Sequence, residues 1–370
     1  MTAARRWTLV GAVVLLLVSL PVLVRALPAH DAEVSATALL ARVRASRDVA
    51  FSGYAETAGS VPLPDNAELE SLGKLLGRTN KERVWWRDPS TWRVATLRTT
   101  GETDLWHSGN RMLRWEYESR SVTLVPDRDV RLPMTADLLP HELARRVLAG
   151  ARPGELSRIG AQRVAGRDAL GLRLVPSDPQ SSIGRVDVYV DRASGLPLEV
   201  AMFGRHATRP SLTTRFVDLR IGAPAASALS FSPPRDAIFQ TDEVVDIADA
   251  ANRFASRVPP PTMAGLAQRR PPSGVPGSVG VYGRGPTVLI AVPLWELSAT
   301  RVREDLEGKP GARTIDAGVL VTTPPLRLLL TEPEPERSGS AWLLAGTVTR
   351  VALEDAAAQL QASPPGLALP

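Results

Sequence analysis

Cysteine is absent from this chain of 370 residues, which excludes disulfides, thiolate metal sites, a cysteine nucleophile and a lipid-modified N-terminal cysteine. Lysine is scarce and occurs only as Lys74, Lys81 and Lys309. Arginine therefore carries most of the positive charge behind the net charge of +5. This excess is too small and too dispersed to indicate a nucleic-acid partner, although it suits an anionic membrane surface.

The sequence also lacks the motifs of catalysis. No G-x-S-x-G nucleophile elbow occurs, and Gly280–Gly285 is not followed by the Lys-Ser/Thr of a P-loop. Asp187 and Asp191 lie four apart, and we interpret them as exposed charges along a strand. None of the histidines has a partner at metal-binding spacing; they are His30, His107, His141 and His206. The sequence thus predicts a non-enzymatic protein with no catalytic residues, no metal site and no cofactor.

The N-terminus has the pattern of a targeting segment. Arg5 and Arg6 precede an uncharged, mostly apolar run from Trp7 to Val24, and Arg25 follows it. A basic region before an apolar one is typical of a secretory signal, and this run also approaches the length of a spanning helix. Residues 1–29 are therefore either a cleaved signal peptide or a retained membrane anchor. Both alternatives place the remainder outside the cytoplasm, in the periplasm or cell envelope.

The stretch from Val164 to Arg205 predicts three consecutive antiparallel strands. Each strand has apolar residues at every second position, which places them on one face of a pleated strand. These residues are Leu170, Leu172 and Leu174, then Val186, Val188 and Val190, then Leu198, Val200 and Met202. Asp191–Gly195 supplies a hairpin connection between the last two strands.

Similar patterns extend this meander in both directions. Helices are predicted over 32–46 and 140–149, and strands over 49–57, 83–87, 91–99, 103–107, 111–117, 121–125, 159–165 and 212–221. An antiparallel sheet with helices gathered on one side belongs to the α+β class. If the sheet curls without closing, its concave side becomes a groove for apolar ligands.

Residues 58–80 insert a short amphipathic helix between two strands. Leu69, Leu72, Leu75 and Leu76 lie on one face of it at helical spacing. This face must cover something apolar. The helix either packs on the sheet as ordinary core or forms a lid over a hydrophobic cavity, and the sequence leaves both alternatives open.

Tryptophans are concentrated in the strands that follow the insert. Trp85 and Trp86 are adjacent, so they point to opposite faces of their strand. At least one of them needs shelter other than the main core, from the lid, a partner or a bound apolar chain. Besides the leucines of the insert, the predicted cavity residues are Trp86, Trp92, Trp115, Val188 and Val200.

Several short motifs occur in a fixed order along the chain. They are LWHSGN at 105–110, AGRD at 165–168 leading into LRLVP at 172–176, VYVD at 188–191, SGLPL at 194–198 and FSPP at 231–234. In this order they resemble the LolA-like superfamily of lipoprotein carriers, and in particular its RseB/MucB type, regulators of envelope-stress sigma factors. The resemblance covers roughly residues 32–240. It implies a curved antiparallel half-barrel whose concave side is plugged by helices and binds acyl chains or lipidated partners.

Beyond residue 240 the composition changes. Pro/Gly-rich segments at 258–261 and 269–277 indicate a linker region over 241–278, after the half-barrel domain of 30–240. Strands over 279–282, 287–293, 319–322 and 327–330, the segment 340–348 and a helix over 351–360 predict a small α+β domain over 279–370. VYGRG at 281–285 and GTV at 346–348 resemble the C-terminal domain of the RseB/MucB type.

Two functions of different classes follow from the resemblance. The first is an extracytoplasmic regulatory sensor that binds an apolar ligand (lipid, acyl chain or lipoprotein) in the half-barrel and a membrane protein such as an anti-sigma factor. The second is a carrier that moves lipid or lipoprotein between envelope layers. A retained anchor counts against the carrier, because a tethered protein cannot cross a wide gap. A hydrolase has only the hydrophobic pocket in its favour.

Overall fold

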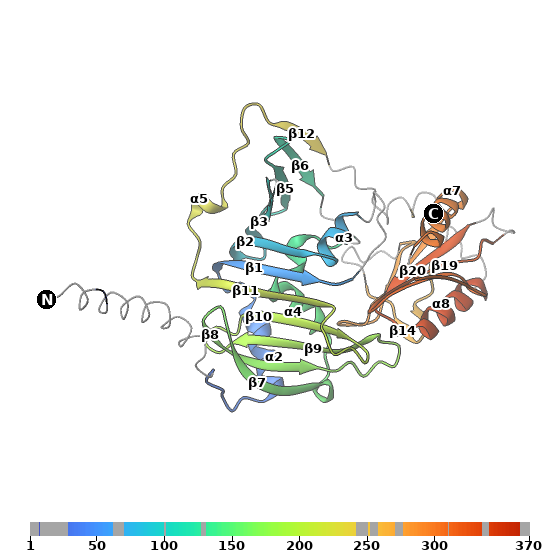
Figure 1. Ribbon diagram of the computed structural model, residues 1–370, viewed down its shortest axis with the longest axis horizontal. Coiled ribbons are helices and arrows are strands. Elements are labelled where there is room, and N and C mark those ends of the chain that lie inside the picture. The colour runs from blue at the N-terminus through green and yellow to red at the C-terminus, as the bar shows by residue number, and fades with distance from the viewer. Residues whose placement is uncertain are drawn as a thin grey trace.

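Two large β-sheets organise the chain (Figure 1). The computed structural model describes residue 7 and residues 29–61, 70–99, 101–126, 131–241, 251, 258–270, 277–309, 311–334 and 340–362. Most of the predicted signal or anchor segment lies outside these residues. Within the described part of the chain, no helix is both long and apolar enough to cross a membrane.

The first sheet has twelve strands in the order β12-β6-β5-β4-β3-β2-β1-β11-β10-β9-β8-β7. They are β1 (Phe51–Gly59), β2 (Thr79–Asp88), β3 (Thr91–Arg98), β4 (Gly101–Ser108), β5 (Arg111–Glu116), β6 (Ser121–Val125), β7 (Leu156–Val164), β8 (Arg167–Leu174), β9 (Ile183–Asp191), β10 (Pro197–Gly204), β11 (Leu212–Ile221) and β12 (Ile238–Thr241). All neighbours are antiparallel except β12, which runs parallel to β6. Because β7 and β12 remain as separate edges, the sheet curves without closing (Figure 1). The predicted α+β class with an open, curved sheet is confirmed.

The predicted meander forms β8, β9 and β10. Val188 lies opposite Leu172 on one side and Val200 on the other, and all three side chains are fully buried. The hairpin between β9 and β10 uses Gly195 at φ +75°, where a Cβ atom would also come within 2.8 Å of the Arg42 carbonyl oxygen. Glycine is required here for the backbone conformation and for the close approach of the neighbouring helix.

Helices cover one face of the first sheet, hereafter the helix-covered face. They are α2 (Ala36–Ala45), α3 (Glu70–Leu76) and α4 (Pro140–Val147), with the short 3₁₀ turns η1 (Ser46–Asp48), η2 (Thr135–Leu138) and η3 (Pro153–Glu155). The Ser35 hydroxyl accepts the Ala38 N–H at 3.1 Å and caps α2, and Pro140 opens α4 at its first position. α2 contributes Leu39, Leu40 and Val43 to one apolar cluster with the valines of β9 and with α4.

The opposite face of β2 to β5 carries a second aromatic layer. The Arg93 guanidinium lies 4.5 Å from the ring of Trp85 and 4.3 Å from that of Trp106, and it pairs with Asp104 at 2.6 Å. Phe231, which follows the short helix α5 (Ala226–Leu229), stacks on Trp106 at 5.3 Å. The Arg93 side chain therefore covers part of the half-buried Trp85 ring.

The second sheet has six strands in the order β15-β16-β20-β19-β18-β17. Its strands are β15 (Gly280–Tyr282), β16 (Leu289–Leu294), β17 (Ala312–Ile315), β18 (Gly318–Thr323), β19 (Leu326–Thr331) and β20 (Ala341–Gly346), with helices α7 (Glu296–Glu307) and α8 (Arg350–Ala362). A small hairpin of β13 (Thr262–Met263) and β14 (Leu266–Ala267) falls in the predicted linker region, and Met263 and Leu266 pack into the core of this sheet. α7 and β17 are not predicted by the sequence.

Hydrogen bonds and an ion pair join the two sheets. The Ser182 N–H donates to the Thr347 carbonyl at 3.0 Å, and the Thr349 N–H donates to that of Gln180 at 2.7 Å. Arg284 binds both carboxylate oxygens of Glu155, at 2.7 and 2.6 Å. The hydrogen bonds from Arg284 hold the pKa of Glu155 well below its ordinary value. Because the Glu155 side chain is only 3% exposed, the Arg284 guanidinium supplies the hydrogen bonds that water would otherwise make to the carboxylate.

Arg284→Ala is expected to lower the free energy of unfolding by about 2–4 kcal/mol at neutral pH, because it leaves the Glu155 carboxylate buried without its cation. The depressed pKa of Glu155 stabilises the fold above the ordinary pKa of glutamate, and this contribution is lost as the pH falls through the folded value. The difference in the free energy of unfolding between the parent and Arg284→Ala should therefore decrease at acid pH. Urea unfolding measures it, with Arg350→Ala, which removes an exposed helix pair with Glu354, as the control. Equal losses in the two variants would contradict this role of Arg284.

Candidate functional site

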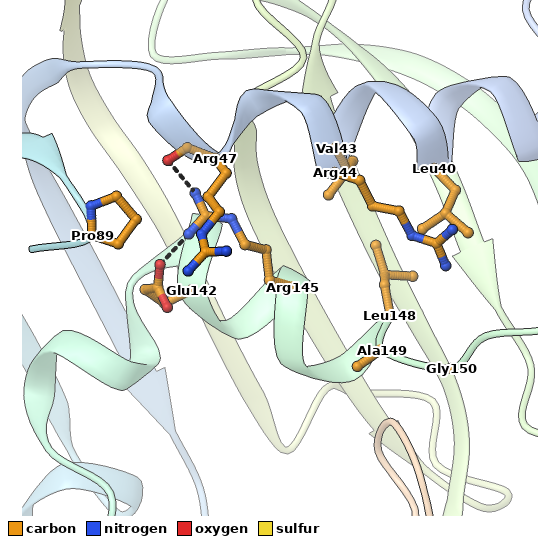
Figure 2. Close-up of a pocket in the computed structure, with 10 residues that line it drawn as sticks. All are labelled: Leu40, Val43, Arg44, Arg47, Pro89, Glu142, Arg145, Leu148, Ala149 and Gly150. Carbon is orange, nitrogen blue, oxygen red and sulfur yellow. Dashed lines mark hydrogen bonds and ion pairs between the residues drawn. The ribbon is translucent and has the colours of Figure 1, made fainter. Parts of the chain in front are cut away.

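A cavity of about 410 Å³ lies between α2 and α4 on the helix-covered face (Figure 2). Its walls come from α2 and η1, from the turn between β2 and β3, and from α4 with the turn that follows it. The lining residues are Leu40, Val43, Arg44, Arg47, Pro89, Glu142, Arg145, Leu148, Ala149 and Gly150.

One wall of the cavity is apolar. Leu40 and Val43 point from α2 toward α4, and Leu148 points back from the end of α4 (Figure 2). All three side chains belong to the apolar cluster that also contains Val188 and Val200 of the sheet. The cavity is therefore continuous with the core beneath it, and an apolar group that enters it meets an apolar surface.

The other wall is positively charged. Arg47 and Arg145 lie there together with the carboxylate of Glu142, and Arg44 lies nearer to Leu40 and Leu148 (Figure 2). Arg145 donates to Glu142 and to the Arg47 carbonyl oxygen, the latter at 3.4 Å, and so ties α4 to the end of α2 (Figure 2). Burial lowers the pKa of Arg145, yet a guanidinium keeps its charge at neutral pH. The cavity thus complements a molecule with an apolar chain and a negatively charged group.

The structure brings together some of the predicted cavity residues. Val188, Val200 and Leu75 belong to the apolar cluster beside the cavity, and Leu76 packs against it. Leu69 lies outside the described residues, as does the side chain of Leu72.

The predicted tryptophans lie elsewhere. Trp86 and Trp92 stack on each other at 5.7 Å in a second cluster on the helix-covered face. Trp115 packs against Phe231, 5.8 Å away, on the other face of the sheet. None of the predicted residues lines the cavity between α2 and α4.

Sequence reasoning missed the charged wall. Arg44 and Arg47 are exposed residues of α2 and η1, and Arg145 is a half-buried residue of α4, so their local patterns do not mark them as members of one site. The available signal was that arginines flank the apolar stripes of two helices, at 36–45 and 140–147. Only the packing of α2 against α4 brings these arginines to the same cavity.

Glu82 is a second unusual feature of the helix-covered face. The residue is fully buried on β2, and neither carboxylate oxygen has a hydrogen-bond partner among the described residues. Burial, together with the nearby charge of Glu56, raises the pKa of Glu82 to about 8. The side chain is therefore a neutral carboxylic acid at neutral pH.

His141 is fully buried nearby, between the rings of Phe51 and Trp86 at 4.9 and 4.3 Å. Both ring nitrogens lack a hydrogen-bond partner, and burial holds the pKa well below its ordinary value. The imidazole is thus neutral and acts as an aromatic core residue. The described residues contain no group of three or more potential metal ligands, so nothing suggests a metal role for His141.

Glu82→Gln is expected to make stability less dependent on pH. Between pH 4.5 and about 8 the unfolded chain loses the Glu82 proton while the folded protein keeps it, so the free energy of unfolding falls as pH rises. The fall is at most about 1.4 kcal/mol per pH unit. The variant should therefore be more stable than the parent at the upper end of this window, with a gap that narrows toward acid.

Urea unfolding across this pH window measures the gap, and Glu116→Gln on β5, where the carboxylate is partly exposed, serves as the control. A gap between Glu82→Gln and the parent that does not vary with pH would show that the buried carboxyl is not neutral.

No protein-family model matches the sequence, and no curated protein matches it. Solved structures do show similarity. The complex of MucA and MucB from Pseudomonas aeruginosa matches with 18% identity over 87% of this chain and 96% of that chain, at a TM-score of 0.49. A LolA superfamily protein from Nitrosomonas europaea matches with 10% identity over 54% of this chain and 98% of that chain, at a TM-score of 0.26.

Proposed function

We propose that this protein is a non-enzymatic regulatory protein of the cell envelope that binds an acyl ligand on the helix-covered face of its first sheet. The observation that carries the proposal is the cavity between α2 and α4, whose lining combines the apolar side chains of Leu40, Val43 and Leu148 with three arginines. Its volume of about 410 Å³ falls within the range of small-molecule sites, about 300–1,000 Å³. An acyl chain with an anionic end matches both walls.

The predicted cavity residues extend this proposal. An acyl chain longer than the cavity has to continue between the helices and the sheet, where Val188, Val200 and Leu75 form an apolar surface. Burial of apolar area stabilises such a complex by about 25 cal/mol per Å², before the cost of ordering the ligand is subtracted. The leucines of the insert would cover the same chain.

The proposal also includes a protein partner and a location. MucB forms a complex with MucA, and we propose for this chain a partner of the same kind, a membrane protein such as an anti-sigma factor. The protein then acts outside the cytoplasm, either anchored by residues 1–29 or released by their cleavage. The alternative function is a carrier of lipid or lipoprotein in the envelope, which the same cavity would serve and which requires release from the membrane.

Ala149→Trp tests the ligand proposal, because Ala149 is exposed at the rim of the cavity and an indole there narrows it. Native mass spectrometry of the protein purified without detergent should show bound acyl lipid in the parent, and occupancy should fall about tenfold in the variant. Ala358→Trp, an exposed position on α8, is the matched control and should keep the ligand. A parent that shows only its apo mass, and whose tryptophan fluorescence does not respond to added lipid, would contradict the proposal.

The arginines are expected to select an anionic end group. Arg44→Gln combined with Arg47→Gln should weaken binding of dodecanoate about five- to tenfold and leave binding of the uncharged methyl ester unchanged, because each exposed charge contributes up to about 1 kcal/mol. The dodecanoate effect should decrease with added salt. Arg42→Gln, on α2 but outside the cavity lining, is the control. Equal losses for the acid and the ester would mean that the arginines only support the fold.

A further inference from the structure

A row of polar side chains crosses the helix-covered face between its apolar clusters. Glu82 on β2 lies opposite Ala55 of β1 and Thr96 of β3. Thr57 and Thr214 face each other on β1 and β11, and the Thr57 hydroxyl donates to that of Thr214 at 3.1 Å. All of these side chains are buried. A polar row at this position interrupts an otherwise apolar surface.

The hydroxyls of this row have partners, but the carboxyl does not. The Thr96 hydroxyl donates to that of Thr135 in η2 at 3.5 Å, whereas both oxygens of Glu82 remain without a hydrogen bond among the described residues. No described basic side chain pairs with Glu82, and the carboxylate of Glu56 adds to the effect of burial in raising its pKa. A buried polar group without a partner destabilises the fold, so the presence of Glu82 at this position is not explained by stability.

We propose that Glu82 is a subsite for a hydroxyl group carried on the apolar chain of the ligand. A protonated carboxyl offers one O–H donor and one carbonyl acceptor side by side. A hydroxyl matches both, because its oxygen accepts from the acid while its own hydrogen is donated to the carbonyl oxygen. One ligand atom therefore satisfies both unpartnered oxygens of Glu82.

The surroundings fit the apolar chain of such a ligand. Leu212 precedes Thr214 by two positions on β11 and so shares its face, and Leu212 and Leu75 belong to the same apolar cluster. Helix α3 lies at this end of β1 and β2 (Figure 1), held by hydrogen bonds from the Asn80 amide to the carbonyls of Lys74 and Leu75 at 3.2 and 3.0 Å. A ligand reaches Glu82 along the surface that α3 covers. This inference rests on the proposed acyl-binding function.

Dodecan-1-ol and its methyl ether test the subsite, because the ether keeps the chain and the oxygen acceptor but lacks the O–H donor. Binding is followed by the tryptophan fluorescence of the full chain. The alcohol is expected to bind about tenfold more tightly than the ether, because it makes one additional hydrogen bond, from its O–H to the carbonyl oxygen of Glu82. Glu82→Leu should abolish this preference, whereas Glu82→Gln should keep it, since an amide also offers a donor and an acceptor side by side.

Glu116→Gln is the matched control and should leave the preference unchanged. Equal binding of alcohol and ether by the parent would overturn the subsite while leaving the acyl-binding function intact. Tightest binding of dodecylammonium, lost in Glu82→Gln, would also overturn it, because Glu82 would then act as a carboxylate. No response to any of the probes would overturn the acyl-binding function together with the subsite.

Discussion

The apolar face of an open twelve-stranded sheet has to be shielded from water by very little helix, and the first part of the molecule is arranged around that requirement. α2 has ten residues and α4 has eight, so each covers only part of the face. Where they separate, the exposed side chains of Arg44 and Arg47 and the more buried side chain of Arg145 line the gap. The cavity is thus the place where the cover is incomplete, and its mixed lining follows from this.

Both faces of the first sheet bury polar side chains, and these side chains differ in how far they are hydrogen-bonded. On the outer face the buried Asp104 is paired with Arg93, which is itself held between two indole rings. On the helix-covered face Glu82 and His141 are buried without hydrogen bonds. Each such group costs about 1–3 kcal/mol relative to a satisfied one. One oxygen of Asp104 accepts from Arg93, whereas neither oxygen of Glu82 has a partner among the described residues.

The elements that could be predicted are those whose pattern of apolar residues along the sequence matches the face that they bury in the fold. The strands at 121–125 and 212–221 begin and end where alternation and turn residues place them. α7 escapes prediction because it buries only Ala299 and Leu306, too few for a helical period to be visible. The cavity could not be predicted for a different reason. Arg47 and Arg145 come into contact only when α2 and α4 pack together, and no local pattern records that contact.

The junction between the sheets bears directly on the cavity. Arg284 of the second sheet donates to the Gly150 carbonyl at 3.1 Å as well as to Glu155, and Gly150 also lines the cavity. A ligand that pushes α4 away from α2 therefore has to carry Arg284 with it or strain a buried ion pair. Coupling of this kind is reciprocal: a partner of the second sheet whose binding is strengthened by the cavity ligand would strengthen binding of that ligand by the same free energy. A carrier has no need of this connection, whereas a regulator that reports its ligand to a partner depends on one.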